Sequence, residues 1–146
     1  MNPPITPPVG SVVYVDLIPG YMQHSGVYVG DGQVIELNRD GLVCLVGLTE
    51  FSAGGLGQEI HVSCKGEAAV GRSDFADRAW QRLGEVSSYH LLLNNCHQFT
   101  AACMTGQIRN PHNLLRSVKL IAQRLLGADP VWQPICTQAE QAVLLP

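Results

Sequence analysis

Apolar and polar side chains alternate most regularly over residues 24–38, where two β-rich segments flank Asp31 and Gly32. An Asp-Gly pair between two such segments indicates a β-hairpin. Side chains point alternately to the two faces of a strand, so the length of the turn decides which residues share a face. The sequence therefore predicts a hairpin whose chemical meaning depends on its register.

We expect a three-residue turn at residues 30–32 that ends on a left-handed glycine and pairs Val29 with Gln33. A two-residue turn would send His24 and Glu36 to opposite faces, whereas the three-residue turn places them on the same face. Only the three-residue turn separates polar from apolar side chains well. One face then carries Ser25, Val27, Val29, Gln33, Ile35 and Leu37, and the other carries His24, Gly26, Tyr28, Val34, Glu36 and Asn38.

This register sets Gly26 opposite Glu36 and makes His24 and Glu36 diagonal neighbours on adjacent strands. A carboxylate beside an imidazole orients the ring and raises its pKa, which suits the base partner of a thiol. Each residue also has an ordinary interpretation, His24 as a partly exposed strand histidine and Glu36 as a solvated strand residue. The pair becomes informative once a nucleophile is found elsewhere in the chain.

The candidate nucleophile is Cys96, which directly follows the asparagines Asn94 and Asn95 at the end of an apolar segment. Asparagine caps helix N-termini, apolar residues recur at helical spacing after Cys96, and Gly106 is placed to end the helix. A thiol in the first turn lies near the positive end of the helix dipole and its unpaired N–H groups, which lower its pKa. The alternative interpretation of Cys96 is a small buried residue.

The rest of the pattern predicts an α+β protein, with helices packed on one face of a small antiparallel sheet. Further strands are expected at residues 11–16, 42–46 and 59–62. A helix capped by Ser73 or Asp74 is expected to carry an apolar stripe, which consists of Phe75, Ala76, Ala79, Trp80 and Leu83.

A second helix is expected at residues 114–126, and its apolar stripe is typical of core packing. The alternative for this helix is a basic amphipathic surface that contacts a membrane or a protein partner. We expect a Pro-rich arm at residues 1–8, one domain at residues 9–128 and an irregular tail at residues 129–146, docked through Val131 and Trp132.

Residues 24–36, 89–99 and 103–106 together resemble the lecithin:retinol acyltransferase-like family, a circularly permuted branch of the NlpC-type papain-like thiol enzymes. The resemblance extends over residues 9–106, and in that family the histidine precedes the cysteine in the chain. It implies a permuted papain-like fold in which Cys96 matches the nucleophile and His24 matches the general base.

The chain departs from that family at two places. The animal enzymes usually have a second histidine where this sequence has Glu36, and a polar orienting residue is compatible with the wider superfamily. Their cysteine motif usually reads Asn-Cys-Glu-His-Phe, against Asn-Cys-His-Gln-Phe here. We do not expect His97 to be the base, because adjacent side chains on a helix point in different directions.

The activity implied is acyl transfer from an ester, thioester or amide through an acyl-enzyme on Cys96, with a lipid or peptide-like substrate. The acyl group passes to water in a hydrolase or to another acceptor in an acyltransferase. The Cys96 backbone N–H is the expected oxyanion donor, and Tyr28 is a candidate for a second. The alternative is a catalytically inactive binding or interaction module on the same fold.

The composition limits these interpretations. Of the 146 residues, 46% are hydrophobic and 14% are charged, and the net charge of −3 gives no electrostatic reason to expect nucleic acid as a partner. Residues 1–9 lack the features of a signal peptide, and no segment reaches the roughly 18–20 apolar residues of a membrane span. We therefore expect a cytoplasmic or otherwise soluble protein.

Cysteine and histidine spacing predicts free thiols and no metal. The odd number of cysteines and the absence of tight spacing indicate a reducing compartment. No Cys-x-x-Cys pair or histidine ligand pattern occurs, so we expect neither a metal nor a cofactor. Cys103 lies seven positions after Cys96 and is expected to be a packed residue.

Overall fold

The computed structural model describes residues 6–18, 22–52, 59–88 and 95–135, and its largest element is a six-stranded sheet. The order of the strands is β4-β3-β2-β1-β5-β8, and every neighbouring pair is antiparallel. The strands are β1 (Val12–Ile18), β2 (Met22–Gly30), β3 (Gln33–Leu37), β4 (Val43–Gly47), β5 (Ile60–Val62) and β8 (Gln133–Ile135).

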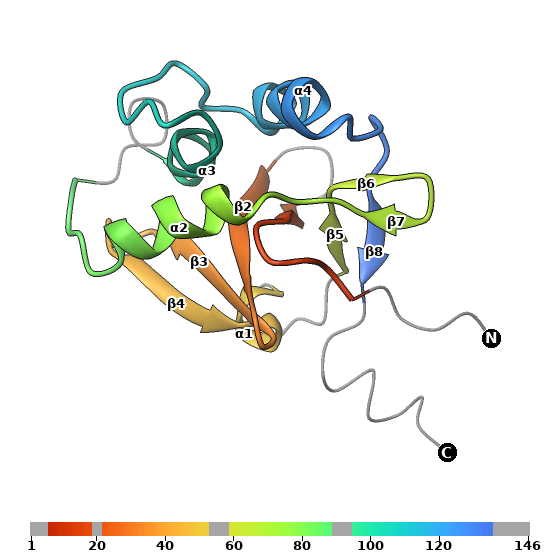
Figure 1. The fold of residues 1–146 in the computed structure, drawn as a ribbon. Helices are drawn as coiled ribbons and strands as arrows, with labels where there is room; N and C mark the ends of the chain where they lie inside the picture. The colour runs from red at the N-terminus through yellow and green to blue at the C-terminus, as the bar shows by residue number, and fades with distance from the viewer. Residues whose placement is uncertain (1–5, 19–21, 53–58, 89–94, 136–146) are drawn as a thin grey trace.

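Helices α2 (Ser73–Arg82), α3 (Cys96–Thr105) and α4 (Leu115–Leu126) cover one face of this sheet, as Figure 1 shows. The short helix α1 (Leu48–Phe51) packs against the other face. A two-stranded sheet of β6 (Cys64–Lys65) and β7 (Ala68–Ala69) lies to the side. The predicted α+β class, with a small antiparallel sheet and helices, is thus confirmed.

Strand β1 shows how the sheet separates two cores. Val12 and Tyr14 pack with the helices, whereas Val13 and Val15 pack with α1 and β5. Alternating side chains must enter opposite cores because both faces of the sheet are covered. This explains why β1 is apolar at successive positions, while β2 alternates more visibly.

The turn of the β2–β3 hairpin differs from the predicted one. Gly30 pairs with Gln33 across a two-residue turn, with φ of 53° at Asp31 and 70° at Gly32. Two consecutive positive φ values are those of a type I′ turn, which matches the right-handed twist of the flanking strands. The predicted three-residue turn is therefore wrong, although Gly32 is left-handed as expected.

A bulge at Val29 nevertheless restores the predicted register in the body of the hairpin. The register shifts between Tyr28 and Gly30, and beyond the bulge Tyr28 pairs with Val34. This register, continued along the strands, sets Gly26 opposite Glu36. The extra residue in β2 thus compensates for the shorter turn.

Two further differences concern the helices and the tail. The N-cap of α2 is Arg72, and neither Ser73 nor Asp74 caps this helix because both lie within it. Trp80 and Leu83, expected in the apolar stripe, are largely exposed. A stripe of Phe75, Ala76 and Ala79 is enough to cover this part of the sheet.

The segment after residue 128 contains a strand where an irregular tail was predicted. Strand β8 pairs with β5, with His61 opposite Pro134, and Trp132 just before it is buried. A proline cannot donate to a ladder, which fits this position at the outer edge of the sheet. Trp132 docks as expected, whereas Val131 is exposed.

Parts of the predicted pattern lie outside the described residues: most of the Pro-rich arm, residues 89–94 before the cysteine, and residues 136–146 of the tail. Among the residues that the structure describes, no helix is long and apolar enough to cross a bilayer.

Candidate active site

The N-terminus of α3 is capped by Asn95, as the sequence predicts. Its side chain accepts hydrogen bonds from the backbone N–H groups of His97 and Gln98, and its carbonyl accepts the N–H of Phe99. Gln98 in turn accepts the N–H of Asn95, which completes a capping box. Of the first four N–H groups of the helix, the cap therefore leaves that of Cys96 for another acceptor.

His24 and Glu36 meet at the end of the β2–β3 hairpin away from its turn. His24 Nε2 lies 2.9 Å from Glu36 Oε2, and only 17% and 11% of the two side chains are exposed. The Phe51 ring of α1 lies 5.3 Å from the imidazole, centroid to centroid. Because Nε2 is taken by the carboxylate, Nδ1 is the ring nitrogen left for a second partner.

The Cys96 thiol, buried at the start of α3, is the group that acts on the pKa of His24 together with Glu36. Burial raises the thiol pKa, but hydrogen bonds with His24 and His97 and the charges of these rings outweigh it and lower the pKa to about 5. Burial likewise lowers the pKa of His24, but hydrogen bonds with Cys96 and Glu36 and their charges raise it to about 10. These opposite shifts favour the thiolate of Cys96 and the imidazolium of His24 over the two neutral forms.

Two other cysteines have the opposite electrostatics. Burial raises the pKa of Cys103 to about 12, and burial followed by the charge of Glu36 raises the pKa of Cys44. Cys103 belongs to the core between the helices and the sheet, as its expected packing role requires. Both thiols stay protonated at neutral pH, so Cys96 differs from them in its partners rather than only in its burial.

His97, which was not expected to take part, is among the groups that lower the pKa of the Cys96 thiol against the effect of burial. Its Nδ1 lies 2.8 Å from Ser25 Oγ, and Ser25 Oγ lies 2.9 Å from Thr100 Oγ1. The hydroxyl of Thr100 donates to the carbonyl oxygen of Cys96 at 2.9 Å. The prediction that His97 is not the base stays a prediction, and it did not include these buried hydroxyl partners. A polar Ser25 on an otherwise apolar strand face was the available signal.

Tyr28, the candidate second oxyanion donor, is not at this site. Its phenol oxygen accepts the backbone N–H of Gly32 at 3.0 Å, which holds the ring near the turn. His24 lies four residues earlier on β2, roughly 13 Å away along the strand at ~3.3 Å per residue. We therefore assign Tyr28 no part in oxyanion binding, whereas the N–H of Cys96 keeps the position that this role requires.

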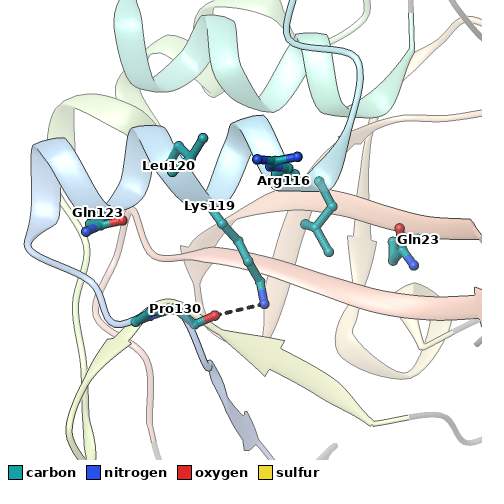
Figure 2. Close-up of a pocket in the computed structure, with 7 residues that line it drawn as sticks. Gln23, Arg116, Lys119, Leu120, Gln123 and Pro130 are labelled. Carbon is teal, nitrogen blue, oxygen red and sulfur yellow. Dashed lines mark hydrogen bonds between the residues drawn. The ribbon is translucent and has the colours of Figure 1, made fainter. Parts of the chain in front are cut away.

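A cavity of about 380 Å³ lies between α4 and the start of β2, where Gln23 directly precedes His24 (Figure 2). Lys119 crosses it and donates to the carbonyl oxygen of Pro130 at 3.1 Å. Burial lowers the pKa of Lys119, and the charge of Asp16 on β1 opposes that shift. Arg116 is exposed at the rim. Among the residues that the structure describes, those that line the cavity are not acidic: they are Gln23, Leu115, Arg116, Lys119, Leu120, Gln123 and Pro130.

Within the described part of the chain, no three His, Cys, Asp or Glu side chains gather in a way that could hold a metal ion. The chain matches no protein-family model, and it matches no curated protein.

Proposed function

We propose that this protein is a cysteine-dependent hydrolase or acyltransferase with the permuted papain-like fold of the NlpC type. One observation carries the proposal: the carboxylate of Glu36 lies 2.9 Å from His24 Nε2, and this supported imidazole is among the groups that, against the effect of burial, lower the pKa of the Cys96 thiol to about 5. A nucleophile, a base and a group that orients the base are the parts that covalent acyl transfer needs. The order of a histidine strand before a cysteine helix supports the fold assignment.

In the first half of the reaction, the Cys96 thiolate attacks the carbonyl carbon of the substrate. The oxygen becomes negative in the tetrahedral intermediate, and the N–H of Cys96 donates to it. The His24 imidazolium then gives its proton to the leaving alkoxide, thiolate or amine as the carbon–heteroatom bond breaks. A thioester on Cys96 and a neutral His24 remain.

In the second half, neutral His24 takes a proton from water or from another acceptor as that group attacks the thioester. The carbon–sulfur bond breaks and returns the thiolate, again beside an imidazolium. Glu36 keeps the ring oriented in both halves and stabilises its charged form. The acceptor decides whether the net reaction is hydrolysis or acyl transfer.

The cavity beside α4 supports an acyl substrate that carries a negative group. Its leucine and proline surfaces suit an aliphatic chain, and Arg116 and Lys119 suit a carboxylate or phosphate. The cavity is lined by Gln23 of β2, the residue that precedes His24 in the chain. Anionic acyl compounds, including lipids, are therefore the substrates that we would test first.

Acyl-enzyme trapping tests the proposed function. The protein is incubated briefly with an activated acyl ester, quenched in acid and digested, and we expect the acyl mass on the Cys96 peptide. Cys103→Ser is the matched control and should still be acylated, whereas Cys96→Ser should show no thioester. A folded protein that carries no acyl group on Cys96 would be the inactive binding module.

A further inference from the structure

The chain that follows α3 returns along that helix toward its N-terminus. Gly106 ends α3 with a φ of 79°, the left-handed conformation at which helices commonly end. In the return segment, residues 107–113, Asn110 makes a reciprocal contact with Gln98 in the first turn of α3. Its carbonyl oxygen accepts Gln98 Nε2 at 2.9 Å, and its Nδ2 donates to the carbonyl oxygen of Gln98 at 3.1 Å. The return segment is therefore attached to the helix end that carries the nucleophile.

The side chain of Asn110 is also fixed from within the return segment. Its Nδ2 donates a second time, to the carbonyl oxygen of Gln107 at 3.1 Å, and its Oδ1 accepts the backbone N–H of His112 at 3.0 Å. A backbone N–H can only donate, so the bond from His112 decides which end of the amide is the oxygen. Both polar atoms of Asn110 are thus bonded, which holds the return segment in one conformation against α3.

Gln98 connects this contact to the helix cap. Its Oε1 accepts the backbone N–H of Asn95 at 2.9 Å, so its Nε2 is the end of the amide that faces Asn110. The Asn95 side chain is held at both ends as well. Its Oδ1 accepts two backbone N–H groups of the first turn, and its Nδ2 donates to the carbonyl oxygen of Asn113 at 2.9 Å. The return segment therefore supports the N-cap directly and through Gln98.

The N-cap sets the direction of the Cys96 N–H. This N–H and the carbonyl of Asn95 belong to one planar peptide group, and in a trans peptide the two point in opposite directions. The Asn95 carbonyl accepts the N–H of Phe99 at 3.1 Å, so it points along the helix. The Cys96 N–H therefore points away from the helix start, where the proposed reaction places the substrate oxygen.

We propose that Asn110 is a positioning residue: acting through Gln98 and the N-cap, it fixes the direction in which the Cys96 N–H meets the developing oxyanion. This inference rests on the proposed function and adds a residue that acts through the helix cap. A donor held in advance stabilises the charge without reorganisation, and a displacement of ~1 Å can slow a reaction roughly 100-fold. Loosening the cap should therefore weaken oxyanion binding more than it changes the reactivity of the thiolate.

The test compares two reactions of Cys96, acylation by a p-nitrophenyl ester and alkylation by iodoacetamide, both followed on the Cys96 peptide by mass spectrometry. Only acylation passes through an oxyanion, and both reactions use the thiolate. The ratio of the acylation rate to the alkylation rate thus reports on the N–H donor and cancels changes in thiol ionisation. In Asn110→Ala we expect this ratio to fall by about tenfold. A purely structural Asn110 would lower the unfolding temperature and leave the ratio unchanged.

Gln98→Glu separates the return segment from the cap. Glutamate keeps an oxygen for the N–H of Asn95, as in the usual capping box, but has no hydrogen to donate to the Asn110 carbonyl. We expect the ratio to fall by about three- to tenfold, because the first turn loses its link to the return segment. A fall in Asn110→Ala without one in Gln98→Glu would overturn the route through Gln98 and, with it, the inference.

Thr105→Val is the matched control, because Thr105 joins the return segment to the opposite end of α3. Its hydroxyl donates to the carbonyl oxygen of Ala101 at 2.9 Å and accepts the N–H of Gln107 at 3.1 Å. This variant should lower the unfolding temperature without changing the ratio. An unchanged ratio in both test variants, in an experiment where the wild-type protein is acylated, would overturn the role of Asn110 alone. If wild-type Cys96 takes no acyl group, the proposed function itself fails.

Discussion

Glu36 Oε2 lies 2.9 Å from His24 Nε2, which leaves Nδ1 as the ring nitrogen that exchanges a proton with Cys96 in the proposed reaction. The carboxylate therefore fixes the ring without competing for the nitrogen that exchanges a proton with sulfur. It also favours the charged form of the ring, through a hydrogen bond and through its charge. Orientation and charge stabilisation by Glu36 are thus separable from proton transfer by His24.

The first prediction separates Glu36 from His24. Glu36→Gln should keep a hydrogen bond to the ring but lose the charge, which lowers the pKa of His24 by roughly 1 to 3 units. Activity should fall yet remain measurable, and Glu36→His should retain more than Glu36→Gln. His24→Ala should lose nearly as much activity as Cys96→Ala, because a nucleophile and its base act as a unit. Complete loss in a folded Glu36→Gln protein would give the carboxylate a direct chemical role.

The second prediction concerns the pH dependence of turnover. Activity should rise as pH increases through the lowered pKa of the thiol, about 5, because the thiolate forms there. It should fall as pH increases through the raised pKa of His24, about 10, because the leaving group then loses its proton donor. The two limbs belong to the coupled pair. In Glu36→Gln the upper limb should move to lower pH while the lower limb moves less.

The third prediction compares the thiols. At pH 7 a limiting amount of iodoacetamide should label Cys96 far faster than Cys44 or Cys103, because only Cys96 is largely ionised. His24→Ala should reduce that advantage by raising the pKa of Cys96. The labelled positions are measured by peptide mass spectrometry, and equal labelling of Cys96 and Cys103 in native protein would contradict the ion pair.

The hairpin shows how the face pattern can be predicted while the turn cannot. Segregation of apolar and polar side chains is a property of the whole strand pair. It therefore indicated which residues share a face with His24 and Glu36. The Asp31-Gly32 dipeptide favoured a type I′ turn by local chemistry, and the bulge at Val29 reconciles the two. A bulge has no sequence signal of its own here, because a valine fits either geometry.

His97 shows the opposite limit. Its partner Ser25 is 72 residues away in the chain, so no local pattern connects them. The thiol, the cap and the end of α3 could be predicted because helix-terminus chemistry is local. The edge strand β8 was missed for the same reason as the Ser25 contact, since its pairing with β5 depends on tertiary structure.

The fourth prediction tests the helix cap. Asn95→Ala should reduce the free energy of unfolding by about 1 kcal/mol, with an upper value near 2 kcal/mol, and should also slow acylation because the N–H of Cys96 loses its support. Asn95→Ser restores a capping oxygen and should recover most of both losses. Asn38→Ala is a fitting control, because Asn38 also accepts two backbone N–H groups but in an exposed turn. That variant should lose stability without slower acylation.

The last prediction concerns the cavity beside α4. Arg116→Gln should raise the KM for an anionic acyl ester by about 1.4- to fivefold, because an exposed ion pair contributes roughly 0.2 to 1 kcal/mol. The KM for a neutral ester of the same chain length should stay the same. Arg124→Gln is the matched control, since Arg124 is exposed on the same helix but does not line the cavity. Equal effects of the two variants would indicate a general charge effect, and no effect of Arg116→Gln on either ester would place the anionic group of the substrate elsewhere.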